Sequence, residues 1–189
     1  MIIGITGGSG CGKTTALECI RQMGGLVLDC DAVYHRLLRE DKALLEAIEK
    51  RFPGSVEQGQ LQRKKLGSQV FSDPEALGDL NRITHGAVYR EVERQRKSEP
   101  RLAAIDAIAL FESGLAELCD VTVAVVAPWE SRVRRLMARE GISREYAENR
   151  LRAQKSDAWY AQKCQYTLEN GGGMVCFRQK CLQFFAGVV

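Results

Sequence analysis

The sequence predicts an α/β fold in which a parallel sheet of about five strands is covered by helices on both faces. Short apolar and β-branched runs alternate along the chain with segments whose apolar residues recur at helical spacing. The first of these runs is followed directly by a glycine-rich loop and then by a helical pattern. Together these observations indicate a three-layer core built from strand, loop and helix in succession.

The core strands are predicted from apolar runs that end at glycines or charged residues. Four runs predict buried strands, and Tyr166–Leu168 predicts a short last strand. The four runs are Ile2–Thr6, Leu26–Leu28, Leu102–Leu110 and Val121–Val126.

The helices are predicted from their start and stop signals. The pattern from Lys13 to Met23 ends at a Gly-Gly pair, and the Ser-Asp-Pro-Glu string at 72–75 is typical of a helix start. Pro128 opens an arginine-rich helix, another begins at 142–145 and ends near Ser156, and the last is Met174–Phe185. The long segment 31–99 contains helical patterns and no convincing strand, so it predicts a helical substrate-binding excursion from the core.

The composition excludes several classes of protein. The chain has 189 residues, and its 27 basic and 24 acidic residues are spread along it, which argues against a nucleic-acid binder. No apolar run reaches the roughly 20 residues that a membrane-spanning helix needs. The N-terminus has no secretion signal, so we expect a cytoplasmic protein whose seven cysteines, with no CxxC pair, are reduced.

One motif carries a specific chemistry. It fits the pattern GxxxxGK[ST] at every required position and lies between a predicted strand and a predicted helix, which disfavours an accidental glycine-rich turn. Its backbone N–H groups can surround an anion, Lys13 can reach the β- and γ-phosphates, and the Thr14 hydroxyl can ligate Mg²⁺. We therefore expect ATP and Mg²⁺ in a P-loop NTPase-type fold. The motif consists of Gly7, Gly8, Ser9, Gly10, Cys11, Gly12, Lys13 and Thr14.

Two carboxylates follow the second predicted strand, at the sheet edge where ligands bind in open parallel sheets. Asp29 and Asp31 flank Cys30, and one of them can accept the proton of an attacking hydroxyl. We expect Asp31 to be the base and Asp29 to support the loop, although one of the pair can simply cap the next helix. Asp106, near the end of the third predicted strand, is a candidate to assist Mg²⁺ through water.

The arginine-rich helix predicts a surface for phosphates. Arg132, Arg135 and Arg139 share one helical face and can close over a transferring group as a lid. The alternative is a solvated face whose arginines pair with Glu130 and Glu140. A GTPase is disfavoured, because the string nearest to its base-reading motif, at 154–157, begins with the wrong residue.

Taken together, these motifs resemble the dephospho-CoA kinase family. The similarity covers essentially the whole chain, and the order of its parts is more specific than any one of them. The parts are residues 3–15, which end at Thr15, then 28–31, 59–66, 70–71, 80–85, 109–112 and 120–121, the run with Arg132, Arg139, Arg150 and Gln154, and Asn170-Gly171.

The resemblance implies transfer of the ATP γ-phosphate to the ribose 3′-hydroxyl of dephospho-CoA, the last step of coenzyme A synthesis. It implies that Asp31 is the base and that Arg139 assists catalysis together with Lys13. The ATP site would be Gly8, Ser9, Gly10, Cys11, Gly12, Lys13, Thr14 and Thr15. Residues that bind the substrate would be Arg63, His85, Glu112 and Arg132.

The resemblance also implies a division of the chain. Residues 1–31, 100–128 and 160–189 would form the nucleotide-binding core, 32–99 a helical CoA domain and 129–159 a lid. Gly86 and Ala109 stand where the family has prolines, residues that shape the backbone. We expect a monomer or small homo-oligomer without nucleic-acid or membrane partners.

Two other functions stay open from the residues alone. One is a P-loop kinase for a nucleoside or nucleoside monophosphate. The other is a module that binds ATP without transferring phosphate. Cys11 also suggests a redox-sensitive loop, because a helix N-terminus favours the thiolate.

Overall fold

The computed structural model describes residues 1–97 and 101–189. The described residues form two compact units, one made of residues 1–28 and the chain from 101 onward, the other of residues 29–97. The boundary expected between residues 99 and 100 lies outside the described residues. No helix among them is long and apolar enough to span a membrane.

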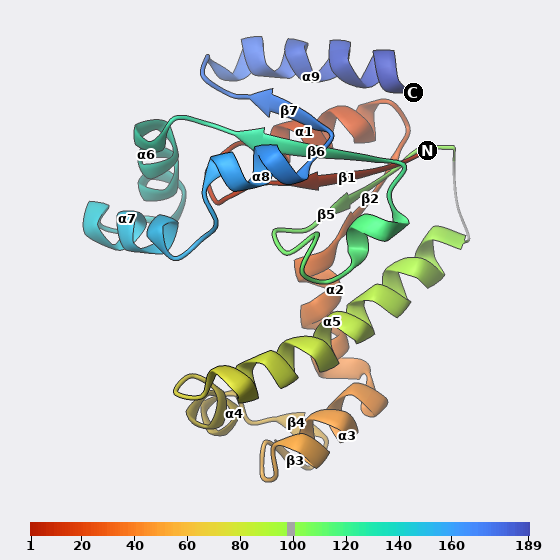
Figure 1. Ribbon diagram of the computed structural model, residues 1–189, viewed down its shortest axis with the longest axis vertical. Coiled ribbons are helices and arrows are strands. Elements are labelled where there is room, and N and C mark those ends of the chain that lie inside the picture. Colours follow the sequence, from red (N-terminus) through yellow and green to blue (C-terminus); the bar gives the residue numbers. More distant parts are fainter. Residues whose placement is uncertain (98–100) are drawn as a thin grey trace. The chain divides into compact units, whose positions relative to one another are not determined.

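The first unit is built on a five-stranded sheet with the strand order β2-β5-β1-β6-β7 (Figure 1). The pairs β1–β5, β1–β6 and β6–β7 are all parallel. The predicted fold class, an α/β protein with a parallel sheet of five strands, is therefore confirmed. The strands are β1 (Ile2–Thr6), β2 (Leu26–Asp29), β5 (Ala103–Asp106), β6 (Val121–Val126) and β7 (Tyr166–Glu169).

Helices cover both faces of this sheet (Figure 1). Alternation along β6 shows the layers: Val123 and Val125 belong to the core beneath α1 (Lys13–Gln22) and α9 (Met174–Val188), whereas Ala124 packs against α8 (Asp157–Lys163). A short 3₁₀ helix, η1 (Leu115–Leu118), also contacts β1.

A helical pair extends from the carboxyl end of β6. It consists of α6 (Trp129–Glu140) and α7 (Arg144–Arg152), which pack through a small apolar cluster of their own. Ser143 begins α7, because its hydroxyl accepts a hydrogen bond from the Tyr146 N–H at 3.2 Å. The predicted start of this helix is thus confirmed, although it ends at Arg152 and a separate helix, α8, follows.

The second unit is mainly helical. Its long helix begins where the sequence predicts, because the Asp73 carboxylate accepts from the Glu75 N–H at 2.9 Å and the Ala76 N–H at 3.2 Å. The elements are α2 (Cys30–Glu40), α3 (Lys42–Arg51), β3 (Val56–Glu57), β4 (Gln60–Leu61), α4 (Arg63–Val70) and α5 (Pro74–Lys97).

Two expectations for the strands were wrong. The segment 31–99 contains a small antiparallel hairpin, β3–β4, whose four paired residues are too few to leave a periodic pattern. The strand predicted over 102–110 ends at Asp106, because the chain then turns with Ser113 N–H donating to Ala109 C=O at 3.0 Å. Leu110 is fully buried in that turn, so the sequence stays apolar after the strand has ended.

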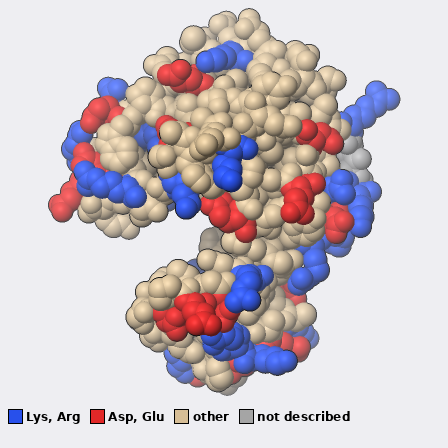
Figure 2. Space-filling model, in the orientation of Figure 1, with Lys and Arg blue, Asp and Glu red and all other residues tan. Residues whose placement is uncertain are grey.

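Charges of both signs mix on the surface. Figure 2 shows Lys and Arg interspersed with Asp and Glu over the face that it presents. On this face, charge alone does not mark a binding site.

The packing of α9 gives a direct test of the core. Phe177→Ala is expected to lower the free energy of unfolding by about 3–5 kcal/mol, because the ring is 2% exposed and its removal leaves a cavity against α1 and the sheet. Met174→Ala in the same helix, where the side chain is 76% exposed, should change it by no more than about 0.5 kcal/mol. Urea titrations followed by circular dichroism measure both values, and equal effects would contradict this packing.

Candidate functional site

The glycine-rich loop lies between the end of β1 and the start of α1, which is the context that its motif requires. Its geometry depends on glycine at Gly7, where φ is 141° and a Cβ atom would lie 2.2 Å from the Val125 carbonyl oxygen. No other residue fits there without moving β6. Gly7 and the neighbouring strand β6 therefore restrict the loop to one backbone path.

The charged and hydroxyl side chains of the motif begin α1. Lys13 donates from Nζ to the Gly7 carbonyl at 2.8 Å, so its ammonium lies back across the loop. Thr14, in the first turn of the helix, is exposed to solvent. The positive end of the helix and the Lys13 charge therefore coincide at the loop, as anion binding requires.

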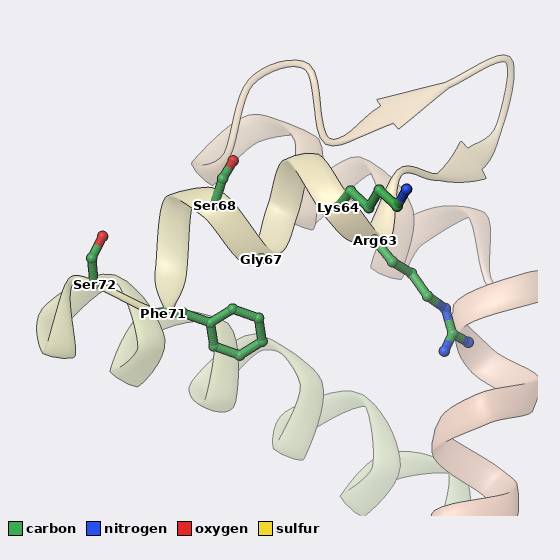
Figure 3. A pocket seen from close by; sticks show the side chains of 6 residues that line it. All are labelled: Arg63, Lys64, Gly67, Ser68, Phe71 and Ser72. Atoms are coloured by element: carbon green, nitrogen blue, oxygen red, sulfur yellow. The ribbon is translucent and has the colours of Figure 1, made fainter.

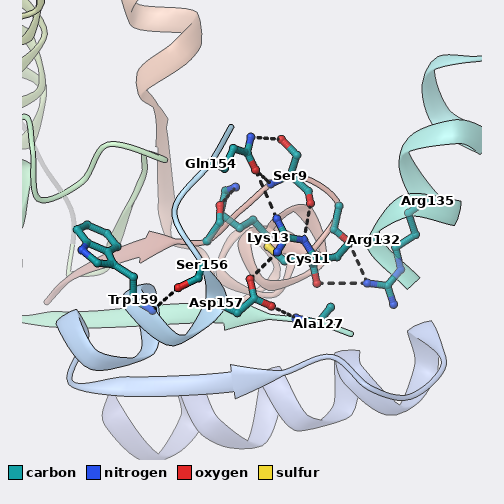
Figure 4. Close-up of polar contacts among 12 residues, drawn as sticks. Ser9, Cys11, Lys13, Ala127, Arg132, Arg135, Gln154, Ser156, Asp157 and Trp159 are labelled. Carbon is teal, nitrogen blue, oxygen red and sulfur yellow. Dashed lines mark hydrogen bonds and ion pairs between the residues drawn. The ribbon is translucent and has the colours of Figure 1, made fainter. Parts of the chain in front are cut away.

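The carbonyl groups of the loop are held by donors from distant segments (Figure 4). Arg132 on α6 donates from Nε to the Ser9 carbonyl at 2.9 Å, and Arg135, one turn later, donates to the Gly10 carbonyl at 3.0 Å. The Asn170 amide donates from Nδ2 to the Cys11 carbonyl at 2.9 Å. Consecutive loop carbonyls are thereby satisfied by side chains of α6 and of the segment after β7.

Arg132 is itself enclosed by polar partners. The residue is 4% exposed, and its guanidinium donates to Asp157 Oδ1 at 2.6 Å. Gly8 leaves room for it, since a Cβ atom there would lie 2.0 Å from Arg132 Nη2. Asp157 Oδ2 also accepts from the Ala127 N–H at 3.2 Å, so this buried charge is paired and its carboxylate is fixed in turn.

Gln154 holds the loop residue Ser9 by two hydrogen bonds (Figure 4). Its Oε1 accepts from the Ser9 N–H at 2.8 Å and its Nε2 donates to the Ser9 hydroxyl at 2.7 Å. We use the name loop brace for Arg132, Gln154 and Asp157. The brace fixes the Ser9 peptide from both sides, which leaves this part of the loop little freedom to relax.

The environment of Cys11 opposes the expected thiolate. The residue is 1% exposed, and burial raises the pKa of its thiol, an effect that the charge of Lys13 only partly offsets. At neutral pH the thiol is therefore protonated and packed among apolar side chains of the core.

The structure places the carboxylates after β2 in different surroundings. Asp29 caps α2, since its Oδ1 accepts from the Ala32 N–H at 2.9 Å. Asp31 is exposed in the first turn of the same helix. The capping role thus belongs to Asp29 and leaves the Asp31 carboxylate accessible.

The remaining expected residues are spread over both units. Arg139 is exposed at the end of α6 and donates to Glu140 at 2.6 Å, which lowers the pKa of that carboxyl. Glu112 is exposed in the turn after β5, where its charge adds to the burial that raises the pKa of Tyr160 to about 12. In the second unit Arg63 is exposed at the start of α4, and His85 is half-buried in α5.

The structural roles of Gln154, Asp157 and Asn170 are absent from the sequence reasoning. Gln154 and Asn170 entered it as parts of the family pattern, and Asp157 only as the end of the string that fails as a base-reading motif. A buried arginine requires a carboxylate partner, but no local pattern indicates that Arg132 is buried. The expectation that Arg132 binds substrate stays a prediction. In the structure its guanidinium donates to Ser9, Gln154 and Asp157.

Among the described residues, no three His, Cys, Asp or Glu side chains gather as metal ligands would. Two side chains near the ends of the loop carry oxygen donors. One is the Thr14 hydroxyl, in the first turn of α1. The other is the carboxylate of Asp106, the residue of β5 that lies beside Ile5 of β1 in the sheet. Such a sparse set suits a Mg²⁺ ion that arrives with nucleotide phosphates and keeps several waters.

Comparison with known proteins agrees with this geometry. The model of the family described as dephospho-CoA kinase matches residues 1–175. The chain is 41% identical over 175 residues to a dephospho-CoA kinase of Thermus thermophilus, covering 92% of this chain and 85% of that protein.

Solved structures give the same result. A crystal structure from Thermus thermophilus is 37% identical with a TM-score of 0.81, covering 100% of this chain and 98% of that one. Dephospho-CoA kinase from Campylobacter jejuni is 26% identical with a TM-score of 0.71, covering 99% and 96%. The resemblance inferred from the motifs is confirmed: the chain belongs to the dephospho-CoA kinase family.

Proposed function

We propose that this protein transfers the γ-phosphate of ATP to the ribose 3′-hydroxyl of dephospho-CoA and releases CoA and ADP. The observation that carries this proposal is the family match over residues 1–175, which spans the phosphate loop and the helical second unit alike. The loop supplies a nucleotide site by its own geometry, and the family supplies the acceptor. A cytoplasmic location follows as part of the same proposal.

In this proposal the loop binds the nucleotide. Its N–H groups, from Gly8 to Thr15, and the Lys13 ammonium bind the phosphates, which requires Lys13 to leave the Gly7 carbonyl on which it rests. The Thr14 hydroxyl would hold a Mg²⁺ ion, and the charge of that ion would offset the negative charge of the phosphates. Arg139 is exposed, and within the described residues its one ion pair is with the neighbouring Glu140, so it has the freedom to turn toward the transferred group.

The acceptor side falls to Asp31 and to residues of the family pattern. Asp31 accepts the proton of the 3′-hydroxyl as its oxygen attacks the γ-phosphorus. Arg63, His85 and Glu112 bind the acceptor in this proposal, and residues 32–99 act as the CoA domain. Arg132 contributes through the loop, because its hydrogen bonds to Ser9 and Asp157 hold the phosphate-binding backbone in place.

The proposal is tested by incubating the purified protein with ATP, Mg²⁺ and one acceptor at a time, while ADP release and product mass are followed. CoA formed from dephospho-CoA alone is the expected result. Transfer to a nucleoside or nucleoside monophosphate would refute the acceptor. ATP binding without any transfer would identify a binding module instead.

The two carboxylates after β2 provide a matched pair of variants. Asp31→Asn is expected to lower kcat by a factor of about 10²–10⁴, the usual contribution of a general base. Asp29→Asn removes the same charge but keeps the helix cap, because asparagine caps as well as aspartate, and should retain most activity. Steady-state rates measure both, and a larger loss in Asp29→Asn would show that Asp31 is the wrong choice of base.

The loop brace makes a separate prediction. Arg132→Lys is expected to raise the KM for ATP roughly tenfold, because one ammonium cannot replace the fork that bonds Ser9, Gln154 and Asp157 together. The KM for the acceptor should change little. Arg144→Lys, at an exposed arginine of α7, is the control and should leave both values unchanged.

If Arg132 contacted substrate directly and not the loop alone, Arg132→Lys would lower kcat while direct ATP binding stayed normal. Titration with a fluorescent ATP analogue separates the two cases, because it reports the loop without turnover.

A further inference from the structure

A groove along α4 in the second unit is a candidate ligand site. It is a wide, solvent-open groove with a volume of about 670 Å³, within the size range of small-molecule sites. Two adjacent rows with a spacing of four residues line it, and each runs along α4 and ends on one of the two residues that follow the helix. The first row is Arg63, Gly67 and Phe71, and the second is Lys64, Ser68 and Ser72 (Figure 3).

One end of the groove is cationic. Arg63 and Lys64 form the first turn of α4, and neither makes an ion pair within the described residues. Their neighbour Lys65, by contrast, is paired with Glu57. Two uncompensated cations at one helix N-terminus favour an anionic partner, and bidentate recognition by Arg63 suits a phosphate group.

The other end is apolar and uncharged. Phe71 is 84% exposed, more than any other large apolar side chain in the described residues. Its ring lies against the backbone of Gly67, where a Cβ atom would be 2.8 Å from Cε2. A ring held on a glycine and otherwise open to solvent presents a flat surface to a bound molecule.

The distance between the two ends fits one part of the proposed acceptor. Arg63 and Phe71 are eight residues apart on the helix, which corresponds to about 12 Å of rise. Dephospho-CoA carries a diphosphate joined to an uncharged pantetheine arm. We propose that the diphosphate binds at Arg63 and Lys64 and that the pantetheine arm lies along Gly67 onto the ring of Phe71. This inference rests on the proposed function.

The test compares the kinetic constants of three variants with those of the full-length wild type. Phe71→Ala is expected to raise the KM for dephospho-CoA roughly tenfold, the effect of losing one aromatic contact surface. Its kcat and KM for ATP should stay within about twofold, because the ring is exposed and fills no core. Leu77→Ala, at a partly exposed apolar residue of the same unit outside the groove, is the control.

Gly67→Ala separates binding from folding. Alanine stabilises a helix relative to glycine, so the unfolding temperature should rise. The added Cβ displaces the Phe71 ring, so the KM for dephospho-CoA should rise as well. If Gly67 and Phe71 served folding alone, the unfolding temperature would rise while the KM stayed unchanged, and that result would overturn the proposal.

Two fragments identify which part of the acceptor lies on the ring. Phe71→Ala should weaken competition by 4′-phosphopantetheine by the same factor as the KM and leave competition by AMP unchanged. Weakened AMP competition instead would place the adenine on Phe71 and overturn the proposal. An unchanged KM would overturn it too, as would a change confined to self-association in sedimentation.

These outcomes are distinct from failure of the proposed function. If the proposed function is wrong, the wild-type protein will release no ADP with dephospho-CoA, and that result would refute both the function and the groove. A wild type that makes CoA, with Phe71→Ala equally efficient, would refute the groove alone.

Discussion

A loop that turns its N–H groups toward an anion turns its carbonyl oxygens away from it, and those oxygens then need donors inside the protein. This requirement organises the first unit. The donors come from α1, α6 and the segment after β7, and each of these follows a strand of the parallel sheet. The donor and acceptor pairs are Lys13 to Gly7, Arg132 to Ser9, Arg135 to Gly10 and Asn170 to Cys11.

Much of the fold could be predicted because its signals are local. The loop motif defines the end of β1 and the start of α1, and Asp73 begins α5 by bonding N–H groups two and three residues away. Prediction from the sequence failed where burial in the folded chain, and not the period of a helix or strand, determines which residues are apolar. Leu110 is apolar because it is buried in a turn, and the two-residue strands β3 and β4 depend on each other and not on their own sequences.

The candidate site could be predicted only on its nucleotide side. The spacing of Lys13 and Thr14 within one motif predicts their roles, and both lie at the start of α1. Gln154 and Ser9, in contrast, are 145 residues apart, and a lone glutamine on a polar segment has many ordinary uses. Each loop carbonyl needs a hydrogen-bond donor, but only the folded chain shows which side chain supplies it. The same holds for the groove on α4, where the exposure of Phe71 cannot be read from an apolar letter.

The loop brace also bears on how quickly a cation can reach the transferred phosphate. α6 is bound to the loop by hydrogen bonds from Arg132 and Arg135, and it packs on α7 through Val133 and Leu136. A hinged swing of that pair would break contacts on which the loop depends. Rotation of the exposed Arg139 side chain, in its proposed role, breaks none of those contacts. Such rotations take picoseconds to nanoseconds, whereas hinged segments take microseconds to milliseconds.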